Sequence, residues 1–222
     1  MQAAQFALAR LPCPVPLDQL RIPGPRIGYL GAIDPLLDLD LIVEVARRRP
    51  DWHLVLAGPI AGLARWQVPT RPNIHRLACL RASQVPEHVS DWDVAILPFK
   101  RTAGEAMGAL AVSRARELLV AGRPVVATSV PRIVQSFGRA GVVRIADGPS
   151  EMVGAIEDAL AGRRERGEWL ARVDSALAAQ ASSLEGPEPR DHPGQRLAVS
   201  LGVALAAALR IQRIRRRADP RT

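Results

Sequence analysis

The sequence predicts an α/β domain built on one parallel sheet, and three observations carry this prediction. Short apolar runs of strand length alternate along the chain with amphipathic segments of helix length. Such alternation is typical of parallel strands joined by crossover helices. The 222 residues suffice for one large domain with its own core. A content of 48% hydrophobic and 23% charged residues is that of an ordinary globular protein, so the composition excludes a chain that is disordered throughout.

Each element is predicted from its own pattern. In the first helix Leu39, Ile42 and Val43 recur at helical spacing, and Pro50 ends it. Ser150 is expected as the N-cap of a later helix and Gly162 as its terminator. The six strands are expected at 26–31, 53–58, 73–79, 93–99, 124–129 and 141–147. The helices are expected at 39–49, 84–90, 110–121, 131–138, 150–161 and 167–181.

The two ends of the chain differ from its body. Prolines crowd residues 1–25, and because proline fixes φ and lacks an N–H donor, this stretch is predicted to be a connector. The domain is expected over 26–182, a proline- and glycine-rich linker over 183–195, and an Arg-rich helix and tail over 196–222. The apolar stretch of this tail is shorter than the about 20 residues that a membrane span needs.

Charge and cysteine spacing exclude several classes of function. The net charge is +8, but eight arginines against three acidic residues fall within 186–222, so the body is nearly neutral and nucleic-acid binding is not expected. Cys13 and Cys79 lack disulfide-framework or zinc spacing, and the four histidines lack metal spacing, so no metal is expected. The first residues lack the basic and apolar regions of a secretory signal, which predicts a cytoplasmic protein.

A glycine turn follows the first predicted strand. Gly28 and Gly31 are spaced GxxG, and the full GxGxxG pattern is absent, so a nicotinamide cofactor is not expected. A turn of small residues that leads from a strand into a helix still suits a phosphate, because backbone amides can approach the anion. Ordinary packing of a strand–helix loop is the alternative interpretation.

A second candidate site lies on the helix predicted at 110–121. Ser113, Arg114 and Glu117 fall in its N-terminal part. A hydroxyl, a guanidinium and amides at a helix start suit a diphosphate, and a carboxylate one turn further suits the two hydroxyls of a ribose. The alternative is a solvent-facing helix on which Arg114 or Arg116 pairs with Glu117.

The order of these motifs resembles that of a known family. The stretches that carry the resemblance are RIGYLGAID, LDLDLIVEVARRRPDWHLVLAGP, RPNIHRL, VSDWDVAILPF, RELLVAGRPVVATSVP and GVVRIAD. Over about 22–180 the chain is similar to the C-terminal, donor-binding domain of bacterial GT-B glycosyltransferases, and most of all to the retaining group that handles cell-surface polysaccharides. The resemblance implies a single Rossmann-like, doubly wound, six-stranded sheet that holds a nucleotide-sugar, with an extra C-terminal helix.

The resemblance also implies roles for particular residues. Gly31, Ala32 and Asp34 match the loop that lies beside the donor phosphates, together with Ile33 between them. The loop at 78–81 would lie near the base.

On the predicted helix, Glu117 matches the glutamate that holds the ribose hydroxyls. Arg114 stands where a cation, lysine in close relatives, contacts the pyrophosphate, and Ser113 adjoins it. A nucleotide-diphosphate sugar would be a substrate, so the resemblance implies no cofactor.

The sequence departs from the family at the sugar. Ala109 replaces a glutamate that touches the donor sugar in many relatives, and Ala111 and Val112 replace the Ser-Pro start of this helix in the closer group. No catalytic residue is therefore assigned. Glu105 is the one candidate, and movement of its loop would have to bring it to the sugar.

Two functions from different classes remain. The first is a glycosyltransferase of the hexosyl type, acting on a polysaccharide or glycolipid acceptor with a second polypeptide that supplies the acceptor domain. The second is a non-catalytic interaction module derived from the same fold, which docks through 196–222 on a partner, a second copy or the cytoplasmic face of a membrane. Base, sugar, acceptor and oligomeric state are not fixed by the sequence.

Overall fold

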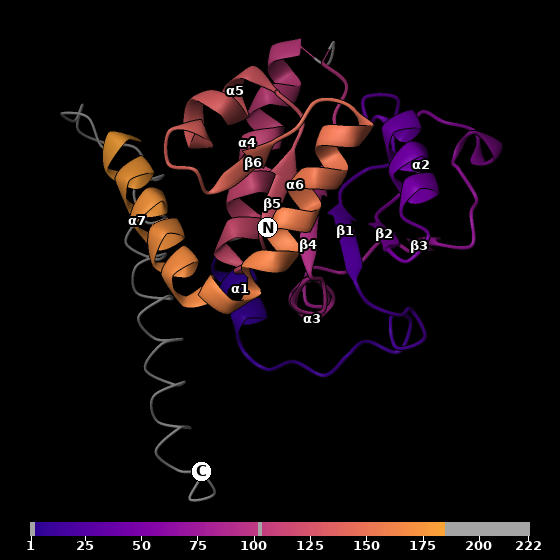
Figure 1. Cartoon of the computed structure of the whole chain (residues 1–222), viewed down its shortest axis with the longest axis horizontal. Helices are drawn as coiled ribbons and strands as arrows, with labels where there is room; N and C mark the ends of the chain where they lie inside the picture. Colours follow the sequence, from indigo (N-terminus) through magenta and orange to yellow (C-terminus); the bar gives the residue numbers. More distant parts are fainter. Residues whose placement is uncertain (1–2, 102–103, 185–222) are drawn as a thin grey trace, which may run out of the picture.

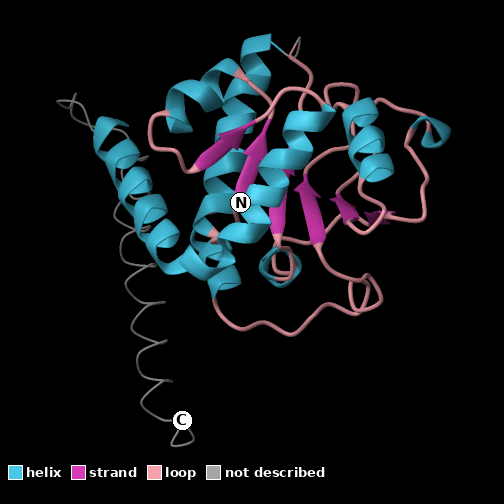
Figure 2. Ribbon diagram, viewed as in Figure 1, coloured by secondary structure: helices cyan, strands magenta, loops and turns pink. Residues whose placement is uncertain are grey.

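Six parallel strands in the order β3-β2-β1-β4-β5-β6 form the sheet at the centre of the molecule (Figures 1 and 2). The computed structural model describes residues 3–101 and 104–184. The strands are β1 (Arg26–Leu30), β2 (His53–Ala57), β3 (Ile74–Leu77), β4 (Val94–Leu97), β5 (Val125–Ala127) and β6 (Val143–Ile145). The chain reverses its direction of progress across the sheet between β1 and β4, so the predicted doubly wound α/β fold is confirmed.

Helices cover both faces of this sheet. α2 packs on α6 on one face, whereas α1 contacts both α3 and α4 on the other face, and α7 contacts α4 (Figure 1). The helices are α1 (Ala3–Ala7), α2 (Leu39–Arg48), α3 (Val85–Ser90), α4 (Gly104–Val120), α5 (Pro131–Ile133), α6 (Pro149–Ala161) and α7 (Arg166–Leu184). Short turns are η1 (Leu8–Arg10), η2 (Arg65–Gln67), η3 (Val134–Gly138) and η4 (Gly162–Glu165).

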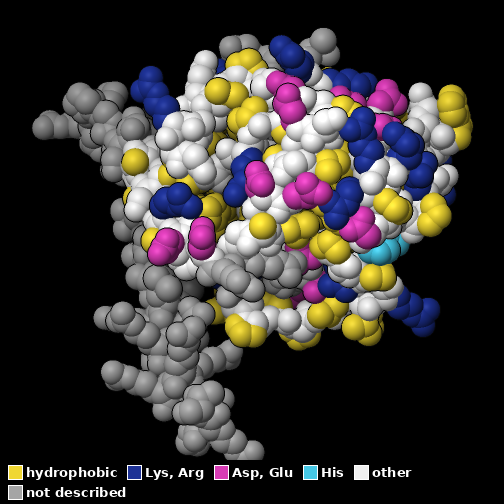
Figure 3. Space-filling model, viewed as in Figure 1, with side chains coloured by type: hydrophobic (Ala, Val, Ile, Leu, Met, Phe, Trp, Pro, Cys, Tyr) yellow, Lys and Arg dark blue, Asp and Glu magenta, His cyan; other side chains and the backbone are white. Residues whose placement is uncertain are grey.

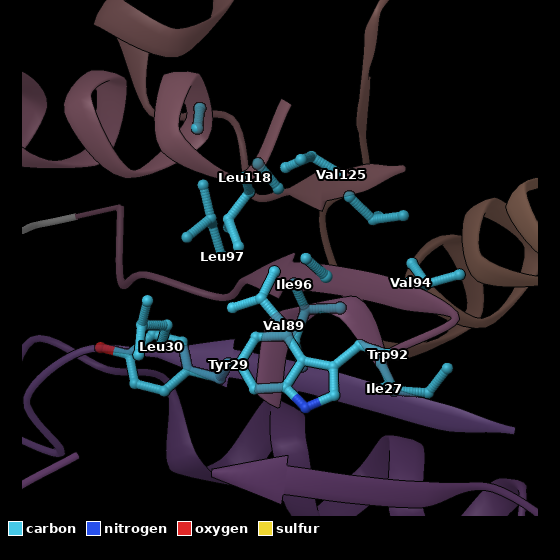
Figure 4. Close-up of a cluster of buried hydrophobic side chains, with 14 of the residues drawn as sticks. Ile27, Tyr29, Leu30, Val89, Trp92, Val94, Ile96, Leu97, Leu118 and Val125 are labelled. Carbon is cyan, nitrogen blue, oxygen red and sulfur yellow. The ribbon is translucent and has the colours of Figure 1, made fainter. Parts of the chain in front are cut away.

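The central strands are covered on both faces, which is why their sequences read as unbroken apolar runs. Figure 4 shows part of this core, to which β1, β4 and β5 contribute Ile27, Leu97 and Val125, and all three are fully buried. Gly28 belongs to the same core. A Cβ at Gly28 would lie 1.9 Å from the Trp92 ring, so this glycine serves close packing within β1 and is not part of the turn after it.

Two helix starts differ from the sequence prediction. α4 begins at Gly104, about six residues earlier than expected, because the alanine, glutamate and methionine that follow Gly104 favour helix more strongly than the glycines oppose it. The N-cap of α6 is Gly148 and not Ser150, since Pro149 occupies the first helical turn. The predicted terminator Gly162 is the C-cap of α6.

The segment before β1 contributes side chains to the core. Phe6 in α1 is fully buried, and Arg10 donates two hydrogen bonds to the Asp174 carboxylate of α7. Gln19 accepts a hydrogen bond of 2.7 Å from the Trp92 indole N–H. At the other end α7 continues to Leu184, and the predicted tail lies outside the described residues. Within the described part of the chain, no helix is both long and apolar enough to span a membrane.

Candidate nucleotide-sugar site at the carboxyl edge of the sheet

The loop after β1 continues alongside the loop after β2. Gly31 N–H donates to Ala57 O at 3.0 Å, and Ile33 N–H donates to Pro59 O at 2.8 Å. Ile33 O accepts from Ala61 N–H at 3.0 Å. The backbone groups of Gly31 and Ile33 are therefore hydrogen-bonded to the end of β2 and the loop that follows it.

The even-numbered residues of the same loop have free amides. In an extended chain successive N–H groups point to opposite sides, so those of Ala32 and Asp34 face away from β2, toward the β4 side of the sheet. Within the described residues neither N–H has a hydrogen-bond partner. Both residues are half-buried. The loop thus presents two backbone donors at the point where the strand order reverses, which is where open α/β sheets bind ligands.

Glycines bring these loops close together. A Cβ at Gly58 would lie 1.9 Å from Gly31 O, so the two loops pack with no space for a side chain. A Cβ at Gly31 would lie 2.7 Å from the Tyr29 hydroxyl oxygen. Gly31 is therefore required by its contact with Tyr29, independently of any ligand.

The predicted residues of α4 form an ion pair. Arg114 Nη1 donates to Glu117 Oε2 at 2.7 Å, and the two side chains are 25% and 12% exposed. Arg116 instead donates to Gln180 of α7 at 3.3 Å, and Ser113 is exposed. The pairing proposed as the alternative interpretation is thus present, although Glu117 faces the protein and not the solvent.

The early start of α4 changes one part of the prediction. Ser113 and Arg114 lie more than two turns beyond Gly104, so the free amides of a helix start are not available to them. Glu105 stands in the first turn, about 18 Å along the helix axis from Glu117 at 1.5 Å per residue. The Glu105 side chain lies outside the described residues, and its catalytic role stays a prediction.

Tyr29 links the two halves of the site. Its side chain is buried, and its hydroxyl donates to Ala32 O at 2.7 Å. Burial raises the pKa of this hydroxyl above its ordinary value, the Asp34 carboxylate raises the pKa further, and the Arg114 guanidinium lowers it. Asp34 of the loop and Arg114 of α4 are thus both close enough to Tyr29 to act electrostatically on its hydroxyl.

A pocket opens beside the loop after β1, at the carboxyl ends of β2 and β3. Its lining residues are Ile33, Gly58, Pro59, Ile60, Leu63, Arg65, Arg76, Leu77, Ala78 and Cys79. The loop at 78–81 was predicted to lie near a base, and two of its residues line the pocket. Sequence reasoning missed Arg65 and Arg76. The position of Arg76 near the carboxyl end of a strand was the available signal, since ligands bind at that edge.

Charge over the rest of the described surface is mixed. On the face drawn in Figure 3, basic and acidic side chains are interspersed over α2 and α6. Glu44 of α2 illustrates this, because it accepts hydrogen bonds from both Arg47 and Arg48. Among the described residues, no group of three or more His, Cys, Asp or Glu side chains could hold a metal ion.

Comparisons with known proteins point to glycosyltransferases. No family model matches the chain. A stretch of 112 residues, 49% of this chain, is 34% identical to a putative teichuronic acid biosynthesis glycosyltransferase, TuaH, of Bacillus subtilis (strain 168), and it spans 28% of that protein. The chain thus covers about a quarter of the length of this relative.

Two solved structures share the fold. Anabaena Alr3699/HepE in complex with UDP and glucose gives a TM-score of 0.54 at 17% identity, covering 94% of this chain and 54% of that one. The C-terminal domain of a glycosyl transferase group 1 family protein (LpcC) from Francisella tularensis gives a TM-score of 0.51 at 12% identity, covering 81% of this chain and 92% of that domain. The chain therefore resembles a glycosyltransferase in sequence along about half of its length. It has the fold of the C-terminal domain of GT-B glycosyltransferases.

Proposed function

We propose that this chain is the donor-binding half of a glycosyltransferase, which binds a nucleotide-diphosphate sugar at the carboxyl edge of its sheet. The observation that carries the proposal is the pair of free amides at Ala32 and Asp34. We place these amides and Arg114 in one donor-binding crevice, because Asp34 and Arg114 both act on the Tyr29 hydroxyl. Two backbone donors and a guanidinium suit the oxygens of a diphosphate. The complex of HepE with UDP and glucose supports the same ligand class.

Binding would rearrange the Arg114–Glu117 ion pair. A pyrophosphate carries more negative charge than one carboxylate, so it competes for the Arg114 guanidinium. Glu117 would then be free to accept hydrogen bonds from ribose hydroxyls. The base would enter the pocket at the ends of β2 and β3, where Arg65 and Arg76 supply donors.

Glycosyl transfer also needs an acceptor held against the donor. Holding two reactants in place contributes roughly 7 to 11 kcal/mol to lowering a barrier. We propose that a second domain, on this polypeptide or a partner, positions a cell-surface polysaccharide or glycolipid acceptor. The name of the Bacillus subtilis relative, a putative teichuronic acid biosynthesis glycosyltransferase, supports that acceptor class. We place this activity in the cytoplasm.

Calorimetric titration with UDP, GDP and their sugars tests the donor site. Glu117→Ala should weaken the binding of UDP or GDP by about tenfold, the effect of losing a charge-assisted hydrogen bond. It should not weaken the binding of inorganic pyrophosphate, because it removes the carboxylate that competes for Arg114. Glu44→Ala is the matched control, because Glu44 is also an arginine-paired glutamate but lies on α2. Absence of nucleotide binding at millimolar concentration would remove the proposal.

A non-catalytic interaction module is the second candidate. The residues on α4 at the expected sugar-proximal positions favour it, because Ala109 is exposed and Ala111 is buried, and neither offers a polar group. Such a module would dock through the tail at 196–222 on a partner, a second copy or a membrane surface. Truncation after residue 186 separates the two functions, since a docking module loses association whereas a donor-binding domain keeps its nucleotide.

A further inference from the structure

We infer that Tyr29 is a positioning residue for the diphosphate. Its hydroxyl donates a hydrogen bond to the loop carbonyl whose oxygen would otherwise repel the anion. The inference rests on the proposed donor site. It concerns the backbone of the loop after β1, whose free amides at Ala32 and Asp34 flank the carbonyl in question.

The carbonyl of Ala32 is the group at issue. In an extended chain the N–H and C=O of one residue point to the same side, so Ala32 O faces the crevice together with Ala32 N–H. The Tyr29 hydroxyl donates to this oxygen at 2.7 Å. An uncapped carbonyl oxygen would repel a phosphate oxygen bound at the neighbouring amide.

Packing fixes the Tyr29 hydroxyl in place. The side chain is 2% exposed, and its ring meets Phe99 edge to face, with ring centres 6.3 Å apart and planes at 75°. Figure 4 shows the Tyr29 ring inside the buried cluster and its oxygen at the margin of that cluster. A Cβ at Gly31 would press on this oxygen at 2.7 Å, so the adjacent glycine is the residue type that tolerates the arrangement.

The hydroxyl stays a donor under physiological conditions. Burial and Asp34 hold it in its protonated form, and a neutral hydroxyl adds no charge that would repel a diphosphate. Phenylalanine would keep the ring packing against Phe99 but would leave Ala32 O without its partner. Tyr29→Phe therefore separates positioning from packing.

The test is calorimetric titration of the wild-type chain and Tyr29→Phe with inorganic pyrophosphate, UDP and GDP. We expect Tyr29→Phe to weaken the binding of pyrophosphate and of the nucleotides by the same factor, about 5- to 20-fold, the range expected when one buried hydrogen bond is lost. Glu117→Ala should instead weaken nucleotide binding without weakening pyrophosphate binding. This contrast assigns Tyr29 to the phosphates and Glu117 to the nucleoside.

Gln19→Leu controls for a general loss of stability. Gln19 is fully buried and bonds Trp92 and the His88 carbonyl at the amino edge of the sheet, so its removal also breaks buried hydrogen bonds but leaves the crevice intact. Equal ligand affinity in wild type and Tyr29→Phe would overturn the inference while the donor site stands, and so would an equal weakening in Gln19→Leu. A wild-type chain that binds neither pyrophosphate nor nucleotide would overturn the donor site itself.

Discussion

Arg114 and Glu117 lie one turn apart on α4, and Arg114 Nη1 donates to Glu117 Oε2 at 2.7 Å. The guanidinium is the more exposed partner, so a ligand that approaches this face of α4 reaches Arg114 before Glu117. In the proposed donor site the ion pair would hold a cation ready for the diphosphate and would screen a carboxylate that otherwise repels it.

Changing Arg114 tests whether its charge or its planar shape matters. Arg114→Lys keeps a point charge but loses the bidentate fork, so we expect nucleoside diphosphates to bind within about tenfold of wild type. Arg114→Met removes the charge and leaves Glu117 unpaired, and we expect a loss of about 100-fold. Titration with UDP and GDP measures both. Equal affinity in Arg114→Met and wild type would show that the cation does not contact the ligand.

The contact between the loops after β1 and β2 gives a prediction about stability. Gly58→Ala would place a Cβ 1.9 Å from Gly31 O, a backbone atom that cannot move aside without displacing the loop. We expect the free energy of unfolding to fall by about 2 kcal/mol or more, together with weaker pyrophosphate binding because the amides shift. Denaturant unfolding measures the first effect and calorimetry the second.

Gly154 provides the matched glycine control. It lies within α6, and a Cβ there would meet no atom within 4 Å. Gly154→Ala should raise the free energy of unfolding by up to about 1 kcal/mol, because alanine favours helix and restricts the unfolded chain. A destabilised Gly154→Ala, or an unaffected Gly58→Ala, would contradict the packing described above.

The strands were predictable because buried parallel strands leave a strong signal. Runs such as HLVLA in β2 are apolar on both faces, and helical segments alternate with them. The start of α4 was missed, since the two glycines in its first turns suggest a loop, although the glutamate, alanine and methionine between them favour helix. The contribution of residues 3–25 was also missed, because five prolines suggest a connector, although Phe6, Ala9 and Ile22 are buried.

The candidate site was predictable in part. Arg114 and Glu117 could be named from residue types and family resemblance, as could Gly31, Ala32 and Asp34, and their role as a donor site stays a prediction. Their mutual ion pair depends on side-chain rotamers, so the sequence left it as one of two alternatives. The role of Tyr29 was missed because a tyrosine in an apolar strand is normally interpreted as a residue that packs in the core. Only the fold reveals that its hydroxyl turns back to its own loop.

The N-terminal segment should contribute to the stability of the domain. Phe6 is fully buried and packs with α1 against α4, so Phe6→Ala should lower the free energy of unfolding by about 3 to 5 kcal/mol. Leu17→Ala is the control, since Leu17 is 86% exposed and its loss should change stability by less than about 0.5 kcal/mol. Denaturant unfolding distinguishes them. Similar stability of Phe6→Ala and Leu17→Ala would show that the segment is a mere connector.

Tyr29 should make stability fall at alkaline pH. Its pKa is raised in the folded chain, so the unfolded chain releases this proton first, near pH 10. Below that pH Tyr29 contributes its full stabilisation; above it the free energy of unfolding should decrease by up to about 1.4 kcal/mol per pH unit.

Comparison with Tyr29→Phe isolates this contribution. Burial lowers the pKa of Arg123 to about 10, and a base with a lowered pKa stabilises the fold as pH rises, which opposes the Tyr29 effect in the same range. Arg123 is present in both proteins, so its contribution cancels when the free energy of unfolding of Tyr29→Phe is subtracted from that of wild type at each pH. Tyr29 is also the single tyrosine of the chain, so tyrosinate absorbance reports its ionisation directly. A tyrosinate signal that rises near pH 10 in the folded wild type would show that the hydroxyl is not held by Ala32 O.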